Sequence, residues 1–394
     1  MTALTGKTIV LGVTGGIAAY KAAELLRLLI KAGATVHVAM TEAGTRFVTP
    51  LTFQALSGNT VWTDPWDTRM SNGMAHINLT READLVVIAP ATANFLAKLA
   101  QGLSDDLLST LCLARNCALL VAPAMNREMW ANPATQRNIA LLRADGIGIL
   151  GPGSGEQACG ETGDGRMLEA AEICDAVTAH FQPKLLKGRR VLMTAGPTFE
   201  ALDPVRGLTN LSSGKMGFAL ARACAAAGAE VTLVSGPVSL PTPSGVARID
   251  VRSAMEMRQA VLGAAASSDI FIGVAAVADY RPASTAADKL KKSGETLTVE
   301  FVRNPDILAE VAALPSAPFC VGFAAESQDL DRYAQGKLAA KKLKLVVGNL
   351  VQDGMGGDTN QVVLFDAAGR HPLPLASKED VARDIVIHFS KLLP

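Results

Sequence analysis

The chain has 394 residues, of which 49% are hydrophobic and 19% charged, and its 37 Lys and Arg residues balance its 37 Asp and Glu residues. That length exceeds one typical core and predicts about two domains. A formal net charge of zero and an aromatic content of 5% argue against nucleic acid and anionic membranes as partners, because those surfaces require basic patches or stacking rings.

The cysteines and the N-terminus indicate the compartment. The six cysteines contain no C-x-x-C pair and no framework of the secreted type. The start of the chain lacks the basic residues, apolar run and cleavage site of a signal peptide, and no apolar run reaches the ~20 residues that span a bilayer. We therefore expect a globular protein of the reducing cytoplasm with no membrane partner.

The first half alternates strand-like and helix-like segments. A buried strand is expected at Lys7–Val13, and the turn TGGIAAYK leads from it into a helix that ends at Gly33. Further strands are expected at Thr35–Met40, Leu85–Ala89 and Leu119–Ala122. Strands that alternate with helices predict a parallel, doubly wound sheet, whose ligands bind beyond the carboxyl ends of the strands.

The same pattern restarts after PKLLKGRR. We expect an alanine-rich helix at Gly217–Ala227 and strands at Arg189–Thr194, Glu230–Ser235, Asp269–Val274 and Leu345–Gly348. The polar loop 195–217 exceeds normal connection lengths, which indicates function or disorder. The chain is thus expected to form two Rossmann-like three-layer α/β domains, residues 1–188 and 189–394, that share an architecture without a convincing internal sequence repeat.

The segment Gly151–Met167 holds six glycines and one cysteine, Cys159. So many glycines disfavour a stable helix or strand, because each loses much backbone entropy on ordering and offers no side chain for packing. We expect a loop whose backbone lies close to another part of the molecule or a ligand. A surface linker with an incidental cysteine and a loop with a chemically active thiol both fit this composition.

Glycines also end and follow the first expected strand, at Gly12, Gly15 and Gly16. Backbone N–H groups at a helix N-terminus attract anions, so this turn is a phosphate-binding candidate, although tight packing of strand against helix explains the glycines nearly as well. The pattern is not G-x-G-x-x-G, and Thr41 rather than a clear acidic residue follows the second strand. These features disfavour a dinucleotide site and permit a mononucleotide.

Polar residues follow two further strands. Thr92 and Asn94 come after the third expected strand, and Met125 and Asn126 come after the fourth. Asparagine often caps a helix, so Asn94 and Asn126 could each serve that role instead of a chemical one. His76, in the polar segment NGMAHINLT, could likewise be an ordinary edge histidine.

Together, PAMNREMW, GSGEQACGETGDGRM, His76 and TGGIAAYK resemble the flavin-dependent cysteine decarboxylases that act on phosphopantothenoylcysteine, over residues 1–185. The resemblance implies a flavodoxin-like domain with His76, Asn126 and Cys159 as catalytic residues. It also implies that FMN binds at Gly15, Gly16, Ile17, Thr41, Thr92, Ala93, Asn94, Phe95 and Ala124.

The implied chemistry explains these residue types. Loss of carbon dioxide from a cysteinyl carboxylate leaves an electron pair that needs an acceptor, and a flavin creates one by first oxidising the CH₂–SH group to a thioaldehyde. His76 would act as a base or orient the thiol, Asn126 would hold the carboxylate, and Cys159 would protonate the enethiolate. A mobile glycine-rich flap suits the last role, because it closes over substrate and excludes water.

The second half carries polar motifs of its own. Arg206, Asn210 and SSGKMG lie in the long loop, but the spacing is not that of the phosphate-binding G-x-x-x-x-G-K-[ST] loop. Further candidates follow downstream: Asp279 in GVAAVADYRP, Lys289, Lys291 and Lys292 in DKLKK, NPDIL at 304–308, Phe323, and Lys337 and Lys341. The last two lysines are four residues apart and share one helix face. A solvated surface is the alternative for such charges, and we prefer it for Lys291 and Lys292 taken singly.

These motifs resemble the phosphopantothenate–cysteine ligase domain over residues 189–394, and the whole chain resembles the bacterial bifunctional enzymes of coenzyme A synthesis. The resemblance implies that Asp279 helps to hold Mg²⁺ and that Lys289 stabilises charge at the α-phosphate. Asn210 would hold the acyl-cytidylate, and Arg206 would assist with an anionic group. CTP contacts are implied at Gly273, Val274, Ala275, Asp279, Lys289, Pro305, Asp306, Ile307, Leu308, Phe323, Lys337 and Lys341.

The implied substrates are 4′-phosphopantothenate, CTP and cysteine. The carboxylate attacks CTP to give an acyl-cytidylate and pyrophosphate, the amine of cysteine displaces CMP, and the product is then decarboxylated to 4′-phosphopantetheine. The choice of CTP over ATP rests on the resemblance alone. The resemblance also implies a homo-oligomer, with flavin sites at subunit contacts of trimers, paired ligase domains and a dodecamer as the full assembly.

Two rival classes remain at this point, an NAD(P)-dependent oxidoreductase with two Rossmann halves and a non-catalytic regulatory subunit. The missing dinucleotide fingerprint weighs against the first. The joint presence of His76, Asn126 and Cys159 weighs against the second.

Overall fold

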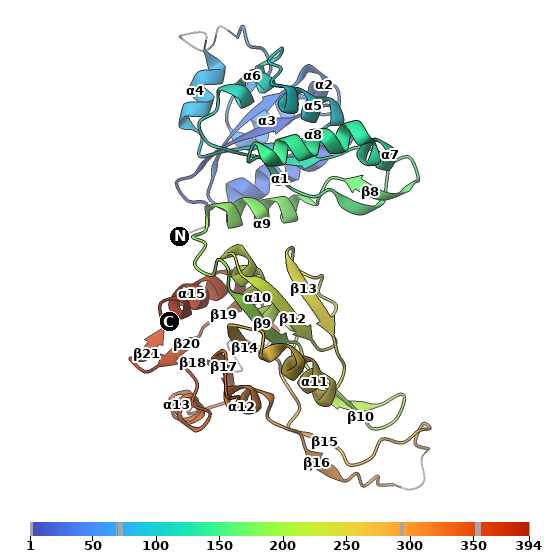
Figure 1. Cartoon of the computed structure of the whole chain (residues 1–394), viewed down its shortest axis with the longest axis vertical. Coiled ribbons are helices and arrows are strands. Elements are labelled where there is room, and N and C mark those ends of the chain that lie inside the picture. The colour runs from blue at the N-terminus through green and yellow to red at the C-terminus, as the bar shows by residue number, and fades with distance from the viewer. Residues whose placement is uncertain (1–2, 68, 70–73, 292–294, 351–355, 394) are drawn as a thin grey trace. The chain divides into compact units, whose positions relative to one another are not determined.

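The computed structural model describes residues 3–67, 69, 74–291, 295–350 and 356–393. The chain divides into two compact units, Met1–Phe181 and Gln182–Pro394, and each is considered by itself (Figure 1). Within the described ranges, no helix combines the length and apolar character needed to cross a membrane. The predicted α/β class is confirmed in both units.

The first unit alternates strands and helices along most of its length. Its elements are β1 (Thr8–Val13), α1 (Ala19–Lys31), β2 (Thr35–Met40), α2 (Glu42–Thr45), α3 (Pro50–Ser57), β3 (Val61–Trp62), α4 (Ala75–Glu82), β4 (Leu85–Ala91), α5 (Ala93–Gln101), α6 (Leu107–Ala114), β5 (Ala118–Pro123), α7 (Arg127–Ala131), α8 (Pro133–Ala144), β6 (Gly148–Ile149), β7 (Gly153–Glu156), β8 (Thr162–Arg166) and α9 (Ala170–Phe181). The strands expected from the sequence at 7–13, 35–40, 85–89 and 119–122 are all present, with small shifts at their ends.

Six of these strands form a parallel sheet in the order β3-β2-β1-β4-β5-β6. This is the order of dinucleotide-binding sheets, whereas flavodoxin sheets run 2-1-3-4-5. The prediction of a flavodoxin-like first domain is therefore wrong as to the order of the strands. The cause is the short β3, which extends the first edge of the sheet by one strand before α4 leads the chain back to the other side of β1. The direction of winding thus reverses between β1 and β4, and ligands bind at such a switch point.

The sheet is buried on both faces, which makes the unit three-layered. Ile9, Leu11 and Val13 of β1 point into a core shared with α1, α3 and α9. Val10 points the other way, into a core shared with α4, α5, α6 and α8. The alternation follows from the two-residue period of a strand, and burial of apolar surface on both sides stabilises the arrangement.

The second unit follows the same plan with additions. Its elements are β9 (Arg190–Ala195), β10 (Phe199–Ala201), β11 (Gly207–Thr209), α10 (Lys215–Ala226), β12 (Glu230–Ser235), β13 (Val246–Asp250), α11 (Ala254–Ala265), β14 (Ile270–Gly273), β15 (Tyr280–Pro282), β16 (Phe301–Arg303), α12 (Ile307–Ala312), β17 (Phe319–Glu326), α13 (Leu330–Ala340), β18 (Leu345–Leu350), β19 (Thr359–Asn360), β20 (Val363–Asp366), β21 (Gly369–Pro372), β22 (Ala376–Ser377) and α15 (Lys378–Ser390).

Its main sheet has the order β13-β12-β9-β14-β17-β18-β20-β21, of which the first six strands are parallel. Those six repeat the order seen in the first unit, so the expected shared architecture is confirmed. The strands β20 and β21 add an antiparallel edge beside β18. Helices α10 and α15 cover one face of the sheet, and α11, α12 and α13 cover the other.

Two glycine-rich or polar segments are more ordered than the sequence suggests. The loop 195–217 contains the antiparallel hairpin β10–β11. The segment Gly151–Met167, expected to be a loop without strands, forms the hairpin β7–β8 with Gly155 opposite Gly163. That expectation was wrong because a ladder is made by backbone groups and needs no side chains. Gly163 and Gly165 also have φ of +157° and +131°, which glycine adopts without steric cost.

Candidate active sites

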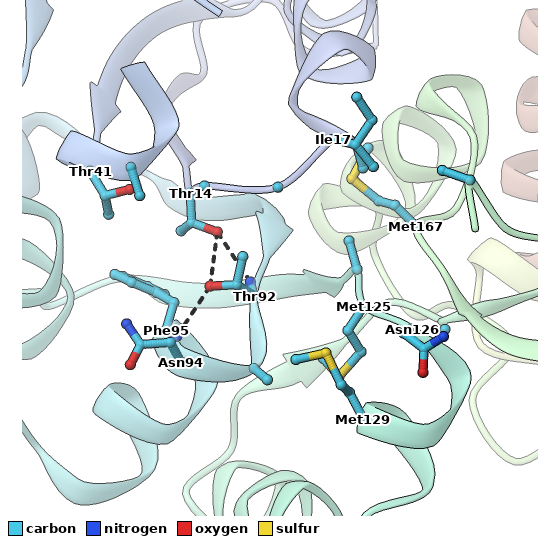
Figure 2. A pocket seen from close by; sticks show the side chains of 18 of the residues that line it. Thr14, Ile17, Thr41, Thr92, Asn94, Phe95, Met125, Asn126, Met129 and Met167 are labelled. Carbon is cyan, nitrogen blue, oxygen red and sulfur yellow. Dashed lines mark hydrogen bonds between the residues drawn. The ribbon is translucent and has the colours of Figure 1, made fainter. Parts of the chain in front are cut away.

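A pocket of about 1210 Å³ opens at the carboxyl ends of β1, β4 and β5, where the winding of the first sheet reverses (Figure 2). All nine positions at which the sequence implies a flavin line this pocket, and so do Asn126 and Cys159. The nine positions come from four separate parts of the chain, which the parallel sheet brings to one edge, and Cys159 comes from a fifth. His76 is not among the lining residues.

The glycines of the first turn serve different purposes. A Cβ on Gly15 would lie 2.4 Å from the Cβ of Ala43, so the β1–α1 turn can approach α2 only with glycine at this position. A Cβ on Gly12 would lie 2.4 Å from Ile88 Cδ1, inside the sheet core. Gly12 is therefore a packing glycine, whereas Gly15 and Gly16 lie on the pocket wall.

Threonines fix the turns on either side of the pocket. The hydroxyl of Thr14 donates to the carbonyl of Pro90 at 2.8 Å and accepts from the amide of Thr92 at 3.1 Å. Thr92 caps α5, because its Oγ1 accepts from the amide of Phe95 at 3.3 Å (Figure 2). Thr41 caps α2 in the same way through the amide of Gly44. The helix-capping role considered for Asn94 thus belongs to Thr92.

Asn126 combines two roles that the sequence left as alternatives. Its Oδ1 accepts from the amide of Glu128 at 2.8 Å and caps α7. Its Nδ2 donates to the carboxylate of Glu161 and lies 3.6 Å from the Sγ of Cys159. The side chain therefore caps a helix with one atom and presents the other toward the flap, which we define as the β7–β8 hairpin with its tip, residues 153–166.

Several contacts hold the flap over Asn126. The amide of Met125 donates to the carbonyl of Gly165 at 2.9 Å, and a Cβ on Gly165 would come within 2.4 Å of the Met125 carbonyl oxygen. Gln157 accepts from the amide of Arg127 at 3.0 Å and donates to the carbonyl of Asp164 at 3.1 Å. The Sγ of Cys159 is exposed, 3.6 Å from Glu161 Oε2. No role was predicted for Gln157 and Glu161, whose one signal in the sequence is their place two residues on either side of Cys159.

The lining of the pocket is largely apolar, with charges paired at its edge. Met125, Met129, Met167, Ile17 and Phe95 provide sulfur and carbon surface. At the edge, Lys21 Nζ lies 2.7 Å from Glu169 Oε1, and Lys98 Nζ lies 2.6 Å from Asp105 and 2.9 Å from Asp106. Burial lowers the pKa of Lys98, but its hydrogen bonds to Asp105 and Asp106 outweigh that effect and raise the pKa above its ordinary value.

His76 lies in the first turn of α4, apart from the pocket of its own chain. The carbonyl of His76 accepts from the hydroxyl of Thr80 at 2.8 Å. Helix α4 belongs to the core on the face covered by α5, α6 and α8. The structure of one chain does not bring His76 together with Cys159.

In the second unit, several of the residues implied for CTP lie around β17 and the carboxyl end of β14. Gly273 ends β14, and Asp306 caps α12 through the amide of Ala309 at 3.0 Å. Lys341 Nζ lies 2.5 Å from Asp306 Oδ2, and Lys337 Nζ donates to the carbonyl of Phe323. Burial lowers the pKa of Lys337, and the charge of Lys341 lowers it further.

Part of this implied set is buried core. Ile307 and Leu308 are 5% and 9% exposed, because their side chains pack into the core under α12. Contact of these two residues with a ligand would therefore be made mainly by their backbone atoms. Pro305 lies just before α12. Val274 and Ala275 directly follow β14, and the backbone amide of Ala275 donates to Thr194 Oγ1 at 3.2 Å.

Asn210 and Asp279 are anchored to the loop that follows β14. Asn210 Nδ2 donates to the carbonyl of Ala276 at 3.0 Å. Asn304, the first residue of the NPDIL motif, is buried, and no role was predicted for it. Its backbone N–H donates to the carbonyl of Asp279 at 2.8 Å, and its Nδ2 donates to that of Ala278 at 2.8 Å. The side chain of Asp279 is exposed, so an ion in solution can reach its carboxylate.

Arg206 is engaged within the protein. Its Nη2 donates at 2.6 Å both to the buried carboxylate of Asp203 and to the carbonyl of Leu290. Burial raises the pKa of Asp203, but hydrogen bonds from Arg206 and from backbone amides outweigh it and hold the pKa far below its ordinary value. Because Leu290 follows Lys289, this cluster fixes the backbone beside that exposed lysine. Lys292 lies outside the described residues.

Two parallel sheets of Rossmann order, one with an apolar pocket and a thiol-bearing flap, are the features of a two-domain α/β enzyme of the flavoprotein class. Residues 1–182 match the family described as "Flavoprotein", and residues 186–392 match the "DNA/pantothenate metabolism flavoprotein C-terminal domain". The chain belongs to the family of coenzyme A biosynthesis bifunctional proteins, CoaBC. The predicted family and a bifunctional enzyme of coenzyme A biosynthesis are thereby confirmed.

The similarity extends over the full length of curated relatives. The chain is 54% identical to "Coenzyme A biosynthesis bifunctional protein CoaBC" of Vibrio cholerae over 98% of both chains. It is 51% identical to the protein of the same name from Escherichia coli K12 over 95% of both chains. Among solved structures, the C-terminal domain of a CoaBC protein is 39% identical, covers 53% of this chain and 98% of its own, and has a TM-score of 0.47.

Proposed function

We propose that the first unit decarboxylates 4′-phosphopantothenoylcysteine with FMN in the 1210 Å³ pocket, and that the second unit makes this substrate from 4′-phosphopantothenate, cysteine and CTP with Mg²⁺. The observation that carries the first part is the convergence of nine flavin positions, Asn126 and Cys159 on one pocket. All six cysteines are free thiols, which suits the reducing cytoplasm proposed as the location.

The pocket fits a flavin by its shape and chemistry. Ile17, Met125 and Met129 offer apolar surface to a flat ring, and the turn at Gly15 leads into the N-terminus of α1, which favours a phosphate. When bound, FMN supplies the two-electron oxidation of the cysteinyl CH₂–SH group and the later return of those electrons.

Residues of the chain perform the remaining steps. Asn126 Nδ2 donates to the substrate carboxylate and orients the C–C bond that breaks when carbon dioxide leaves. The electron pair of that bond passes into the adjacent C=S group and gives an enethiolate. Cys159, 3.6 Å from Asn126 Nδ2, donates its Sγ proton to the carbon end of this enethiolate, while the flap excludes water.

Cys159→Ser tests this assignment. We expect the variant to keep FMN and to release carbon dioxide, but to accumulate an oxidised aminoenethiol because the proton donor is missing. Formation of the ordinary saturated product by the variant would contradict the proton-donor role. A colourless purified protein without flavin absorbance would contradict the flavin site itself.

We also propose that His76 acts in the pocket of a neighbouring copy. Within one chain His76 is not on the pocket wall, whereas Ile17 and Tyr20 at the pocket are 62% and 61% exposed and offer apolar surface to a second chain. Trimers of the first unit and dimers of the second would build the dodecamer. Co-expression of a His76→Asn chain with a Cys159→Ser chain should restore decarboxylation, because a contact between the two kinds of chain brings the intact Cys159 of one together with the intact His76 of the other. If activity is not restored, His76 acts in the site of its own chain.

For the ligase, the carboxylate of 4′-phosphopantothenate attacks the α-phosphorus of CTP and releases pyrophosphate; the amine of cysteine then displaces CMP. Lys289 stabilises charge on the phosphate, Asp279 helps to hold Mg²⁺, Asn210 holds the acyl-cytidylate, and Arg206 supports the backbone beside Lys289. Asn210→Asp should release pyrophosphate and stall at the mixed anhydride. Amide formation at the parent rate would contradict the role of Asn210.

A further inference from the structure

A cluster of two histidines and one aspartate lies at the C-terminal edge of the second unit. Asp366 ends β20, His371 lies on β21, and His388 lies in the last turn of α15. Asp366 Oδ1 is 3.0 Å from His371 Nε2, and Asp366 Oδ2 is 2.8 Å from His388 Nε2. The antiparallel hairpin brings the first two residues together, and the packing of α15 on the sheet adds the third.

The three donor atoms are close enough to share one ion. One ligand atom from each residue lies within 4.8 Å of the other two. Ligands about 2.0–2.2 Å from a tetrahedral zinc ion are themselves a little over 3 Å apart, so small rotations of the imidazoles would accommodate the ion. The two rings are also neighbours, with centroids 4.8 Å apart and planes tilted by 51°.

The surroundings of Asp366 resemble the support that ligating carboxylates receive. Its side chain is 3% exposed, and Oδ1 accepts from the amides of Ala368 at 2.8 Å and Gly369 at 3.1 Å. Such bonds orient a carboxylate before any ion arrives. The side chains of His371 and His388 are 37% and 21% exposed, so solvent can reach the cluster and complete the coordination.

We propose that Asp366, His371 and His388 bind one divalent transition-metal ion, zinc in the first instance, and that the ion joins α15 to the β20–β21 hairpin. Two imidazoles and one carboxylate form a donor set that suits zinc and leaves a position for water. Phe365 pairs with Val346 near the amino end of β18, so the site lies at the edge of the sheet opposite the carboxyl ends that carry the proposed nucleotide site. The ion is therefore distinct from the Mg²⁺ of the ligase reaction.

Zinc binding by the full-length, flavin-loaded chain tests the proposal. Every protein carries Cys159→Ser, which removes the exposed thiol as a competing ligand. After treatment with a chelator, equilibrium dialysis at neutral pH against zinc chloride should show one ion per chain. His388→Gln and His371→Gln should each weaken that binding by at least about tenfold, since even loss of an outer-shell partner costs 10–100-fold. His180→Gln, a histidine elsewhere on the surface, is the matched control and should leave it unchanged.

Thermal unfolding gives the second readout. Zinc should raise the unfolding temperature of the parent and of the His180→Gln control, but not that of His388→Gln, because an ion that binds only the native fold stabilises it. Circular dichroism before dialysis shows whether each variant is folded. Absence of zinc binding by the parent, or equal binding by the parent and both cluster variants, would overturn the proposal and leave Asp366 as a hydrogen-bonded hub alone.

Discussion

The carboxylate of Glu161 accepts a hydrogen bond from Nδ2 of Asn126 and lies 3.6 Å from the thiol of Cys159. Under the proposed function, Asn126 offers that same amide to the carboxylate of the substrate. Glu161, a residue of the flap, therefore places a carboxylate on Asn126 at the position proposed for the carboxylate of the substrate. The substrate must displace Glu161 before its carboxylate can bind.

Glu161→Gln should therefore lower the KM for the cysteinyl substrate. The glutamine keeps the length of the side chain but removes the charge, and a neutral acceptor loses roughly half the strength of a charge-assisted bond. A difference of about 1 kcal/mol corresponds to a KM about fivefold lower. Steady-state decarboxylation measures it, and Asp164→Asn, which removes a charge from the same flap, should leave KM near the parent value. An unchanged or higher KM in Glu161→Gln would show that the contact does not compete with substrate.

Gly165 sets the approach of the flap to the pocket. Its φ of +131° is strained for other residues, and an added Cβ would meet the Met125 carbonyl oxygen at 2.4 Å. Gly165→Ala should displace the flap and reduce decarboxylase kcat/KM by about tenfold or more, because small misplacements of reacting groups are costly. The ligase rate should not change.

Gly160→Ala is the matched control for that substitution. Gly160 also has positive φ, at +83°, but a Cβ there has no atom within 4 Å. It should cost about 1–2 kcal/mol of local backbone strain without moving Met125. Equal losses of kcat/KM in both variants would mean that backbone strain, rather than the approach to Met125, sets the flap.

The positions of strands and of strand-end residues could be predicted from the sequence, because both follow from local patterns. Strands β2 and β12 match the predicted Thr35–Met40 and Glu230–Ser235 at both ends. Thr92 and Ala124 reach one pocket because parallel strands place their carboxyl ends at the same edge.

The contacts made by individual polar side chains could not be predicted in the same way. Asp203, Asn304 and Glu161 are of polar types that usually lie on protein surfaces, so the sequence gives no sign of their roles. Those roles depend on partners up to 87 residues distant in the chain, as for Asp203 and Leu290. The β7–β8 hairpin was missed for a related reason, since its hydrogen bonds join backbone groups that carry no residue-specific signal.

Arg206 should act on the ligase through the backbone that carries Lys289. Its guanidinium donates to Asp203 and to the carbonyl of Leu290, and the amide of Leu290 donates to Asp203 at 3.1 Å. If this cluster positions Lys289, Arg206→Ala and Lys289→Ala remove the same contribution to the transition state. The double variant should then be no slower than Lys289→Ala alone, a departure from additivity typical of residues that act as a unit.

The measurement for this pair is the rate of pyrophosphate release from CTP in the two single variants and the double variant. Arg222→Ala, which removes an arginine paired with Glu379 in the same unit, controls for general loss of stability. Fully additive losses in the double variant would mean that Arg206 contacts the substrate anion directly instead of positioning Lys289.

The ion pair between Lys21 and Glu169 should make the stability of the first unit depend on pH. The hydrogen bond from Lys21 to Glu169 holds the pKa of the Glu169 carboxyl group below the ordinary value of 4.5, so the folded state favours the charged carboxylate. The stabilisation is therefore fully present above pH 4.5 and is lost as the pH falls through the lowered folded pKa. Glu169→Gln should destabilise the unit at pH 7 by about 1 kcal/mol at most, because the glutamate is more than half exposed and solvent screens the pair.

That loss corresponds to a fall in unfolding temperature of about 2–4 °C. The fluorescence of FMN released on unfolding reports this temperature for the first unit alone. The gap between parent and variant should shrink as the buffer is taken from pH 7 to pH 4 and below, because protonation of Glu169 removes in the parent what the substitution removes in the variant. Glu24→Gln, on the same helix as Lys21, controls for the loss of one carboxylate. A gap that stays constant across this range would show that Glu169 stabilises the fold by packing and not by its charge.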